Sequence, residues 1–474
     1  MPRATGSPLL EGPVLKSLLG LAVPVVLANV LQSLYQLIDA FWVGRLGGHA
    51  VAAVSVCFPI TFLLIALGSG LGVAGSTLVA QYMGAGQHDM VNRVAAQTLL
   101  MVALVSIGLS LLGEWLAPSL LTLLGVAPQV YDGALIFLRI SLAAMIFTFG
   151  FAMFQSLMRG IGEVRTPLYI VAGTVALNVI LDPLLIFGFG PLPGLGVGGA
   201  ALATLITQAL ALLVGLWLLL RGRWTIQPTA GDFRPDWAFI RRAFRLGFPA
   251  SVELSARALS MNVMVFLVSG FGTVTIAAYG VGINVLGFVI IPALGLSMAT
   301  AALAGQNIGA GQVERAARIA RLSALIAFVA LSVVGVLVFA FATELVRFFV
   351  PTDEQVIASG GRFLRIVALT FGFMGLQMAL TGVFRAAGQT LVAMVLTLIS
   401  QWVLQFPLAF VLSREAVLGQ SGIWWAFPVT NVVIALITMA WFARGDWMRQ
   451  RLAASEEDPL AERVTEEVFA EEHR

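Results

Sequence analysis

The sequence predicts an all-α integral membrane protein in which twelve transmembrane helices form two six-helix, pseudo-symmetric lobes. Hydrophobic residues make up 59% of the 474 positions and charged residues only 11%, whereas a soluble protein carries about 25% charged residues. Apolar runs close to the roughly 20 residues that cross a bilayer recur along the whole chain. An internal repeat then divides these runs into two equal sets.

The apolar runs set the expected spans and lobes. We expect an N-terminal lobe at 1–220, a cytoplasmic linker at 221–237, a C-terminal lobe at 238–443 and an acidic cytoplasmic tail at 444–474. Lys and Arg are concentrated in the loops on one side, which predicts a multi-pass protein of the cell (inner) membrane with both termini in the cytoplasm. The expected spans are 16–43, 51–82, 93–113, 134–158, 166–189, 197–220, 240–269, 275–305, 316–341, 360–384, 391–412 and 421–443.

The internal repeat is the most informative pattern in the chain. The segments at 21–24 and 81–87 return at 246–249 and 306–312, each shifted by 225 positions (246 − 21 and 306 − 81). Six helices in each half make both halves enter the membrane from the same side, so we expect a symmetry axis along the membrane normal. This is a common plan for alternating-access transporters. Two further matches, shifted by 226, are Phe137-Leu-Arg-Ile140 with Phe363-Leu-Arg-Ile366 and Arg159-x-x-Gly162 with Arg385-x-x-Gly388.

Composition excludes several other classes of function. The single cysteine, Cys57, excludes an internal disulfide and a cysteine-based metal cluster. No glycine loop is followed by Lys-Ser/Thr, so an ATPase is not expected, and no catalytic set indicates an enzyme. The net charge of +3 comes from arginines in short loops, which does not predict binding to nucleic acid. We expect a monomer without an organic cofactor.

Two expected helices carry acidic residues inside apolar runs. In the first span, Asn29, Gln32, Ser33, Gln36 and Asp39 recur at spacings of three and four residues and form one polar stripe. Tyr35 lies one turn before Asp39 on that helix. In the fifth span, Asn178 precedes Asp182 by four residues, and Pro183 follows and should kink the helix. A charge in the hydrocarbon region is costly, so both acids are functional candidates.

The two acids have two possible physical uses. If the two carboxyl groups lie close together, charge repulsion and desolvation raise the pKa of one of them, so that the pair binds a proton near neutral pH. Alternatively, Asp39, Asn178, Asp182 and Thr204 would supply oxygen ligands to a sodium ion. A purely structural interpretation, in which each aspartate bonds only a neighbour on its own helix, remains open.

Further side chains are candidates for lining a substrate cavity. They are Gln32, Gln36, Met261, Met264, Glu253 and Arg257. Methionines suit a surface that adapts to varied ligands, although ordinary helix packing also explains them. Glu253 and Arg257, at i and i+4, form either a structural ion pair or part of the cavity wall.

The pattern resembles the multidrug and toxic compound extrusion (MATE) transporters over nearly the whole chain. The resemblance implies a twelve-helix exporter with a V-shaped central cavity that exchanges cationic drugs for ions across a lipid membrane. In the DinF-like branch, acids of the first and fifth helices bind the coupling ion at positions that match Tyr35, Asp39, Asn178 and Asp182, and more loosely Thr204. The residues that carry the resemblance are Pro24, Leu34-Tyr-Gln-Leu-Ile-Asp39, Gln81-x-x-Gly84-Ala-Gly86, Phe137-Leu-Arg-Ile140, Arg159-Gly-x-Gly162-x-x-x-Thr166-Pro167 and Asn178-x-x-x-Asp182-Pro183.

The NorM-like branch and other classes fit the sequence less well. That branch has a Glu in the seventh helix, where this chain has Arg257, and an Asp in the tenth helix, which here has no acid. A lipid-linked oligosaccharide or lipid flippase of the same superfamily is the alternative. It would favour a cavity rich in basic residues, and Arg257 is the only clear one deep in a span. We therefore expect organic cations as substrates and a proton or sodium ion as the coupling ion.

Overall fold

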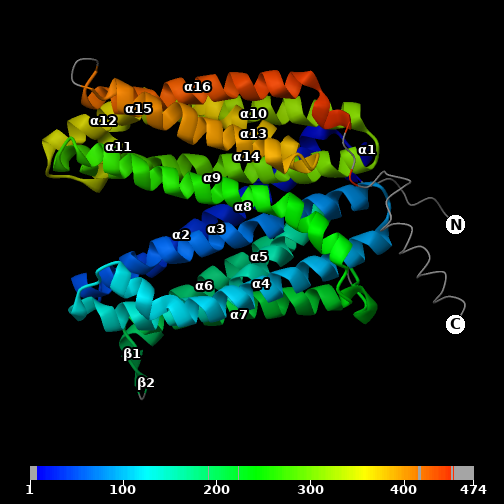
Figure 1. Cartoon of the computed structure of the whole chain (residues 1–474), viewed down its shortest axis with the longest axis horizontal. Coiled ribbons are helices and arrows are strands. Elements are labelled where there is room, and N and C mark those ends of the chain that lie inside the picture. The colour runs from blue at the N-terminus through cyan, green and yellow to red at the C-terminus, as the bar shows by residue number, and fades with distance from the viewer. Residues whose placement is uncertain (1–7, 191, 223, 415–417, 450–451, 453–474) are drawn as a thin grey trace, which may run out of the picture. The chain divides into compact units, whose positions relative to one another are not determined.

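The computed structural model describes residues 8–190, 192–222, 224–414, 418–449 and 452. These residues fold almost entirely into α-helices, with one short β-hairpin (Figure 1). In the first half of the chain the elements are α1 (Pro8–Glu11), α2 (Val14–Gly44), α3 (Gly48–Gly84), α4 (His88–Leu123), α5 (Pro128–Ile161), α6 (Arg165–Phe187), β1 (Gly188–Phe189), β2 (Leu192–Pro193) and α7 (Val197–Leu220).

The second half repeats the long helices of the first. Its elements are the 3-10 helix η1 (Ala230–Phe233), α8 (Trp237–Ser269), α9 (Thr273–Gly309), α10 (Val313–Ala340), α11 (Ala342–Phe349), α12 (Glu354–Ala368), α13 (Phe371–Ala386), α14 (Thr390–Leu398), the π-helix η2 (Ile399–Gln405), α15 (Phe406–Leu412), α16 (Gln420–Arg444) and the 3-10 helix η3 (Asp446–Arg449).

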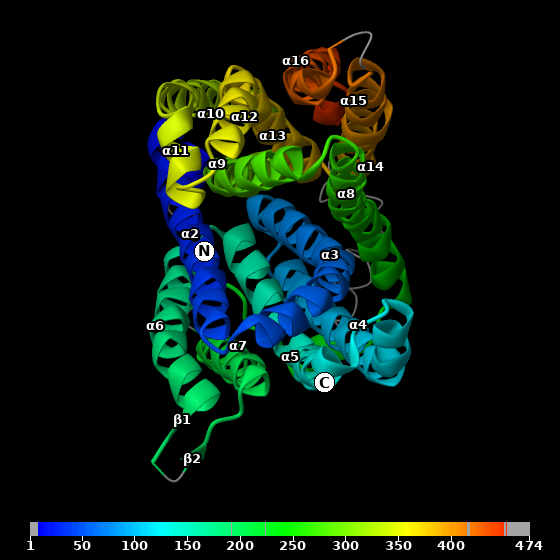
Figure 2. The same cartoon turned by 90° about the vertical axis from the view of Figure 1, so that its left-hand side faces the viewer.

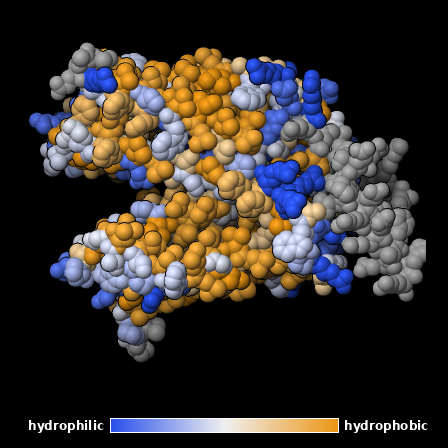
Figure 3. All heavy atoms as spheres, in the orientation of Figure 1, coloured by the Kyte–Doolittle hydropathy of each residue, from blue (hydrophilic) through white to orange (hydrophobic). Residues whose placement is uncertain are grey.

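The length and apolar composition of the helices suit a bilayer. Eleven helices in the described residues are long and apolar enough to cross a membrane, and the bent pair α12 and α13 raises the number to twelve. On the face drawn in Figure 3, hydrophobic side chains cover the middle of the helices, and hydrophilic side chains gather near helix ends. The all-helical membrane fold predicted from the sequence is confirmed.

The chain forms two compact units, and the boundaries between them fall inside the helices α2 and α8 rather than in loops. Among the described residues, unit 1 comprises those of 8–26 and 252–452, and unit 2 comprises those of 27–251. The break in α8 lies 225 positions after the break in α2 (251 − 26), which is the repeat interval. The two units therefore differ from the expected lobes at 1–220 and 238–443. The first part of α2 packs with the second half of the sequence, and the first part of α8 packs with the first half. Of the expected tail, 450–451 and 453–474 lie outside the described residues.

Small residues explain how each helix joins its unit. Within unit 2, a side chain at Gly70 of α3 would overlap the backbone carbonyl of Gly247 and the hydroxyl of Ser251, both on α8. Within unit 1, a side chain at Gly295 of α9 would meet Val26 of α2 at 2.5 Å. Gly70 and Gly295 are 225 positions apart, as are Val26 and Ser251. The repeat has thus preserved two equivalent helix crossings that require glycine.

Four local features of the fold were not predicted. The expected span 360–384 is broken between α12 and α13 with a bend of 52°. The expected span 391–412 contains the π-helix η2, and the short helix α11 precedes α12. The β1–β2 hairpin extends beyond the ends of α6 and α7 (Figures 1 and 2). Hydropathy does not reveal a helix break or a π-helix inside a span, because the residues on both sides of it are apolar.

Gly70 provides a direct test of the crossing in unit 2. Gly70→Ala should destabilise the protein by about 1–3 kcal/mol, because the added methyl group overlaps backbone that cannot move independently. Gly108→Ala is the matched control: nothing lies within 4 Å of a side chain added at that helical position, so alanine should be neutral or stabilise by up to about 1 kcal/mol. Thermal unfolding in detergent measures both. Equal midpoints for the two variants would contradict the crossing.

Candidate functional site

Three helices of unit 2 bring together the polar residues singled out in the sequence. Helix α2 carries Tyr35 and Asp39, α6 carries Asn178 and Asp182, and α7 carries Thr204. On α2 and α6 the two residues are four positions apart and so lie on one face of their helix. Asn178 and Asp182 are fully buried, with 0% exposure, while Asp39 and Thr204 are half-buried.

Hydrogen bonds connect these residues within and between helices. The Asn178 amide donates to Asp182 Oδ1 at 3.0 Å, and the Thr204 hydroxyl donates to Asp39 Oδ2 at 3.3 Å. The Asp39 and Asp182 carboxyl groups also lie close enough for their charges to interact. The purely structural interpretation therefore describes only Asp182, because the bond of Asp39 crosses to another helix.

Thr207 belongs to the same cluster, although it was not predicted. Its hydroxyl is hydrogen-bonded to the Tyr35 hydroxyl at 2.7 Å and donates to the Ala203 carbonyl at 2.9 Å. Thr207 lies one turn after Thr204 in the run Thr204-Leu-Ile-Thr207. That i+3 spacing is the signal that would have found it. Tyr35 is thereby tied to α7 rather than to Asp39.

Three buried oxygen atoms of the cluster accept no hydrogen bond: Asp39 Oδ1, Asn178 Oδ1 and Asp182 Oδ2. A buried acceptor without a donor carries a desolvation cost that a hydrogen bond would offset. A proton on one carboxyl group, or a small cation among the oxygens, would satisfy them. The described residues contain no group of three or more His, Cys, Asp or Glu that suits a metal ion. Any cation here would also depend on the amide and hydroxyl oxygens.

The predicted cavity residues are found in different surroundings. Gln32 and Gln36 are exposed on α2 in unit 2, and Met261 is 42% exposed on α8 in unit 1. Met264 is only 1% exposed and packs in the hydrophobic core of unit 1. The prediction that Met264 lines a cavity is therefore not supported by this structure. Met261 and Met264 are one turn apart on α8, yet one is exposed and the other lies in the core. The residue type alone does not distinguish these two environments.

Glu253 is the centre of a second buried polar cluster, inside unit 1. Its Oε1 accepts a bond from Arg385 of α13 at 2.5 Å and one from Thr397 of α14 at 3.2 Å. Arg257 is farther away, at 3.8 Å. The predicted i,i+4 pair exists, but the shorter ion pair of Glu253 is with Arg385. Sequence spacing could not reveal Arg385, which is 132 positions away.

Comparisons with known proteins identify the family and match the internal repeat. The MatE family model matches residues 24–184 and 249–411, two segments that begin 225 positions apart (249 − 24). The probable multidrug resistance protein YoeA of Bacillus subtilis is 31% identical over 424 residues, covering 89% of this chain and 91% of that protein. The probable multidrug resistance protein YpnP, also of Bacillus subtilis, is 30% identical over 444 residues, covering 93% of this chain and 98% of that protein.

Solved structures show the same fold. The structure of a MOP superfamily transporter from Pyrococcus furiosus aligns with a TM-score of 0.87 at 25% identity, covering 95% of this chain and 100% of that chain. An outward-facing structure of a multidrug resistance MATE family transporter has the same TM-score at 24% identity, with the same coverage.

The cluster around Glu253 predicts different costs for its two arginines. Arg385→Gln should destabilise the protein by about 3 kcal/mol, because it leaves a buried carboxylate without its closest charge partner. Arg257→Gln should cost about 1 kcal/mol or less, because Arg257 is more distant and its side chain is 28% exposed. Thermal unfolding midpoints provide the measurement. The double variant Glu253→Gln with Arg385→Gln should recover part of the loss; no recovery would show that Arg385 acts elsewhere.

Proposed function

Because the chain belongs to the MATE family of transporters, we propose that it is a multidrug exporter that exchanges organic cations for protons or sodium ions. The names of the relatives support the substrate class: YoeA and YpnP are both described as probable multidrug resistance proteins. The buried carboxylate pair of unit 2 supports the ion coupling. Alternating access between the two sides of the membrane is the transport mode proposed.

The single observation that carries the coupling proposal is the set of unsatisfied oxygens around Asp39 and Asp182. Asp182 is fully buried, and each carboxyl group has one oxygen atom with no hydrogen bond. Two such groups close together repel each other when both are charged. Uptake of one proton, or of a sodium ion held by Asp39, Asn178, Asp182 and Thr204, removes that repulsion.

The ion and the drug would then compete through the conformation of unit 2. An organic cation binds best while the carboxylates are charged, and ion uptake neutralises them. Binding free energies are linked reciprocally, so the ion weakens drug binding as much as the drug weakens ion binding. Pro24 lies inside α2 and donates no backbone hydrogen bond. We propose that α2 bends there when Asp39 changes its charge.

This assignment places the coupling site in the first half of the chain, as in the DinF-like branch. In unit 1, Met264 lies 225 positions after Asp39 (264 − 39) and is part of the core. The buried acid of that unit, Glu253, is held by Arg385 instead. These differences argue against NorM-like coupling through the second half.

A flippase for lipid-linked oligosaccharides is the alternative within the superfamily. A pyrophosphate group would favour several unpaired basic residues in the membrane interior. Arg257, the candidate noted in the sequence, lies on the side of α8 that carries Glu253 and is 3.8 Å from its carboxylate. The buried polar cluster of unit 2 carries acids and no arginine or lysine among its described members, which favours cations.

Substitution of Asp39 tests the proposed coupling. Asp39→Asn should reduce efflux of a fluorescent organic cation from proteoliposomes at least tenfold, because the neutral amide cannot exchange a proton or attract sodium. Efflux is measured first under an imposed pH gradient and then under a sodium gradient, and the gradient that drives wild-type efflux identifies the ion. Asp132→Asn, at an exposed acid of α5, is the matched control and should transport normally. Full efflux by Asp39→Asn would refute the coupling role.

A further inference from the structure

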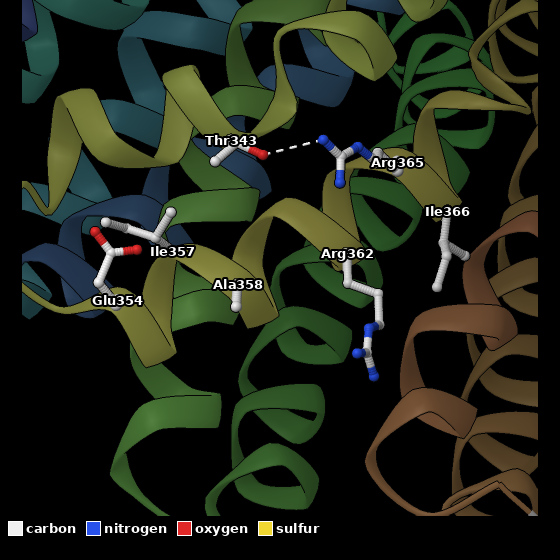
Figure 4. Close-up of a pocket in the computed structure, with 7 residues that line it drawn as sticks. All are labelled: Thr343, Glu354, Ile357, Ala358, Arg362, Arg365 and Ile366. Carbon is white, nitrogen blue, oxygen red and sulfur yellow. Dashed lines mark hydrogen bonds between the residues drawn. The ribbon is translucent and has the colours of Figure 1, made fainter.

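A pocket in unit 1 has a composition that the transport cycle does not explain. It has a volume of about 410 Å³ and lies beside α11 and α12, and Figure 4 shows the residues that line it. Ligand sites commonly have volumes of about 300–1,000 Å³. The lining residues are Thr343, Glu354, Ile357, Ala358, Arg362, Arg365 and Ile366.

The charges of the pocket do not balance. Glu354 is paired with Arg347, which donates to its Oε1 at 3.2 Å. Arg365 donates to the hydroxyl of Thr343 at 3.0 Å, a neutral partner. Arg362 is joined to no other drawn residue in Figure 4, and it forms no ion pair with any acid in the described part of the chain. Two guanidinium groups therefore line the pocket without a carboxylate of their own.

The internal repeat shows that this imbalance is specific to unit 1. Arg365 corresponds to Arg139 in the repeated Phe-Leu-Arg-Ile motif. In unit 2, Arg139 lies 3.5 Å from the carboxylate of Glu114. A shift of 225 or 226 carries Glu114 onto Phe339 or Ala340, both apolar. The second half thus has the arginine at this position but not the acid, and one turn earlier it has Arg362 where the first half has Ile136.

We propose that this pocket binds the phosphate group of an anionic phospholipid. Figure 4 draws the Arg362 and Arg365 side chains pointing in different directions, and both would turn toward one phosphate on binding. Guanidinium groups form strong, directional hydrogen bonds with phosphate. Arg362 is eight residues from the start of α12, about 12 Å along the helix, from which a long side chain reaches the head-group region. The site is separate from the proposed coupling site and does not rest on the proposed transport function.

The surroundings of the pocket favour a lipid over a free inorganic anion. Two lining residues, the exposed Ala358 and the half-buried Ile366, offer apolar surface to an acyl chain. Large hydrophobic side chains near the lining residues in sequence are also exposed, among them Phe341 at 55%, Phe348 at 82% and Leu369 at 59%. Contact with lipid acyl chains would remove such exposed apolar side chains from water. A free phosphate ion would gain nothing from these apolar groups.

Lipid titration of the purified full-length protein tests the proposal. Delipidated protein in neutral detergent is titrated with dioleoyl-phosphatidylglycerol, and bound lipid is counted by native mass spectrometry. Arg362→Gln should weaken binding about fivefold or more, the effect of losing one basic contact. Arg139→Gln, the repeat equivalent of Arg365, is the matched control and should bind like the wild type. Ala358→Phe fills the pocket at an exposed helical position and should weaken binding with all charges kept.

Parallel titrations separate the possible ligands. Dioleoyl-phosphatidylcholine should bind at least fivefold more weakly than phosphatidylglycerol, and inorganic phosphate at matched concentration should not displace the lipid. The proposal is overturned by unchanged phosphatidylglycerol affinity in both Arg362→Gln and Ala358→Phe. It is also overturned if inorganic phosphate competes as well as phosphatidylglycerol does, which would indicate a site for small anions.

Discussion

The energetic cost of placing charged groups in apolar surroundings governs the arrangement of both units. A carboxylate that leaves water must find donors or opposite charge nearby. Asp182 finds the amide of Asn178 on its own helix, and Asp39 finds the hydroxyl of Thr204 on α7. These needs fix how α2, α6 and α7 face one another within unit 2. Some oxygens still lack a partner, and these are the acceptors available for the proton or cation of the proposed coupling.

The buried polar clusters of the two units carry opposite formal charges. In unit 2 the buried cluster contains two acids and no base among its described members, so its residual charge is negative. In unit 1 a single acid, Glu253, lies between Arg257 and Arg385, so the residual charge is positive. Met264, the repeat equivalent of Asp39, contributes to the hydrophobic core instead. Duplication preserved the backbone plan and the helix crossings while the polar chemistry diverged.

Much of the fold and part of the site could be predicted from the sequence, and the physical reasons differ. Helix positions follow from hydropathy, and the cluster of Asp39 with Asn178 and Asp182 follows from acids in apolar runs. Thr207 and Arg385 were not found, because contacts between helices depend on packing rather than on local spacing. The bend between α12 and α13 left no trace in hydropathy. Met264 was predicted to line a cavity but lies in the core, because a methionine suits either environment and its sequence position does not say which one it faces.

The matched breaks inside α2 and α8 have a consequence for how the chain assembles. A cut in the polar linker would divide the polypeptide into its two sequence repeats, yet neither fragment would hold a complete unit. The first would carry residues before Leu27, which pack with the second repeat, and the second would carry the start of α8, whose partners lie on the first. The repeats are therefore not autonomous modules. The hydrophobic interior of each unit includes a helical segment that belongs to the other sequence repeat. We therefore expect the two halves of the chain to fold together.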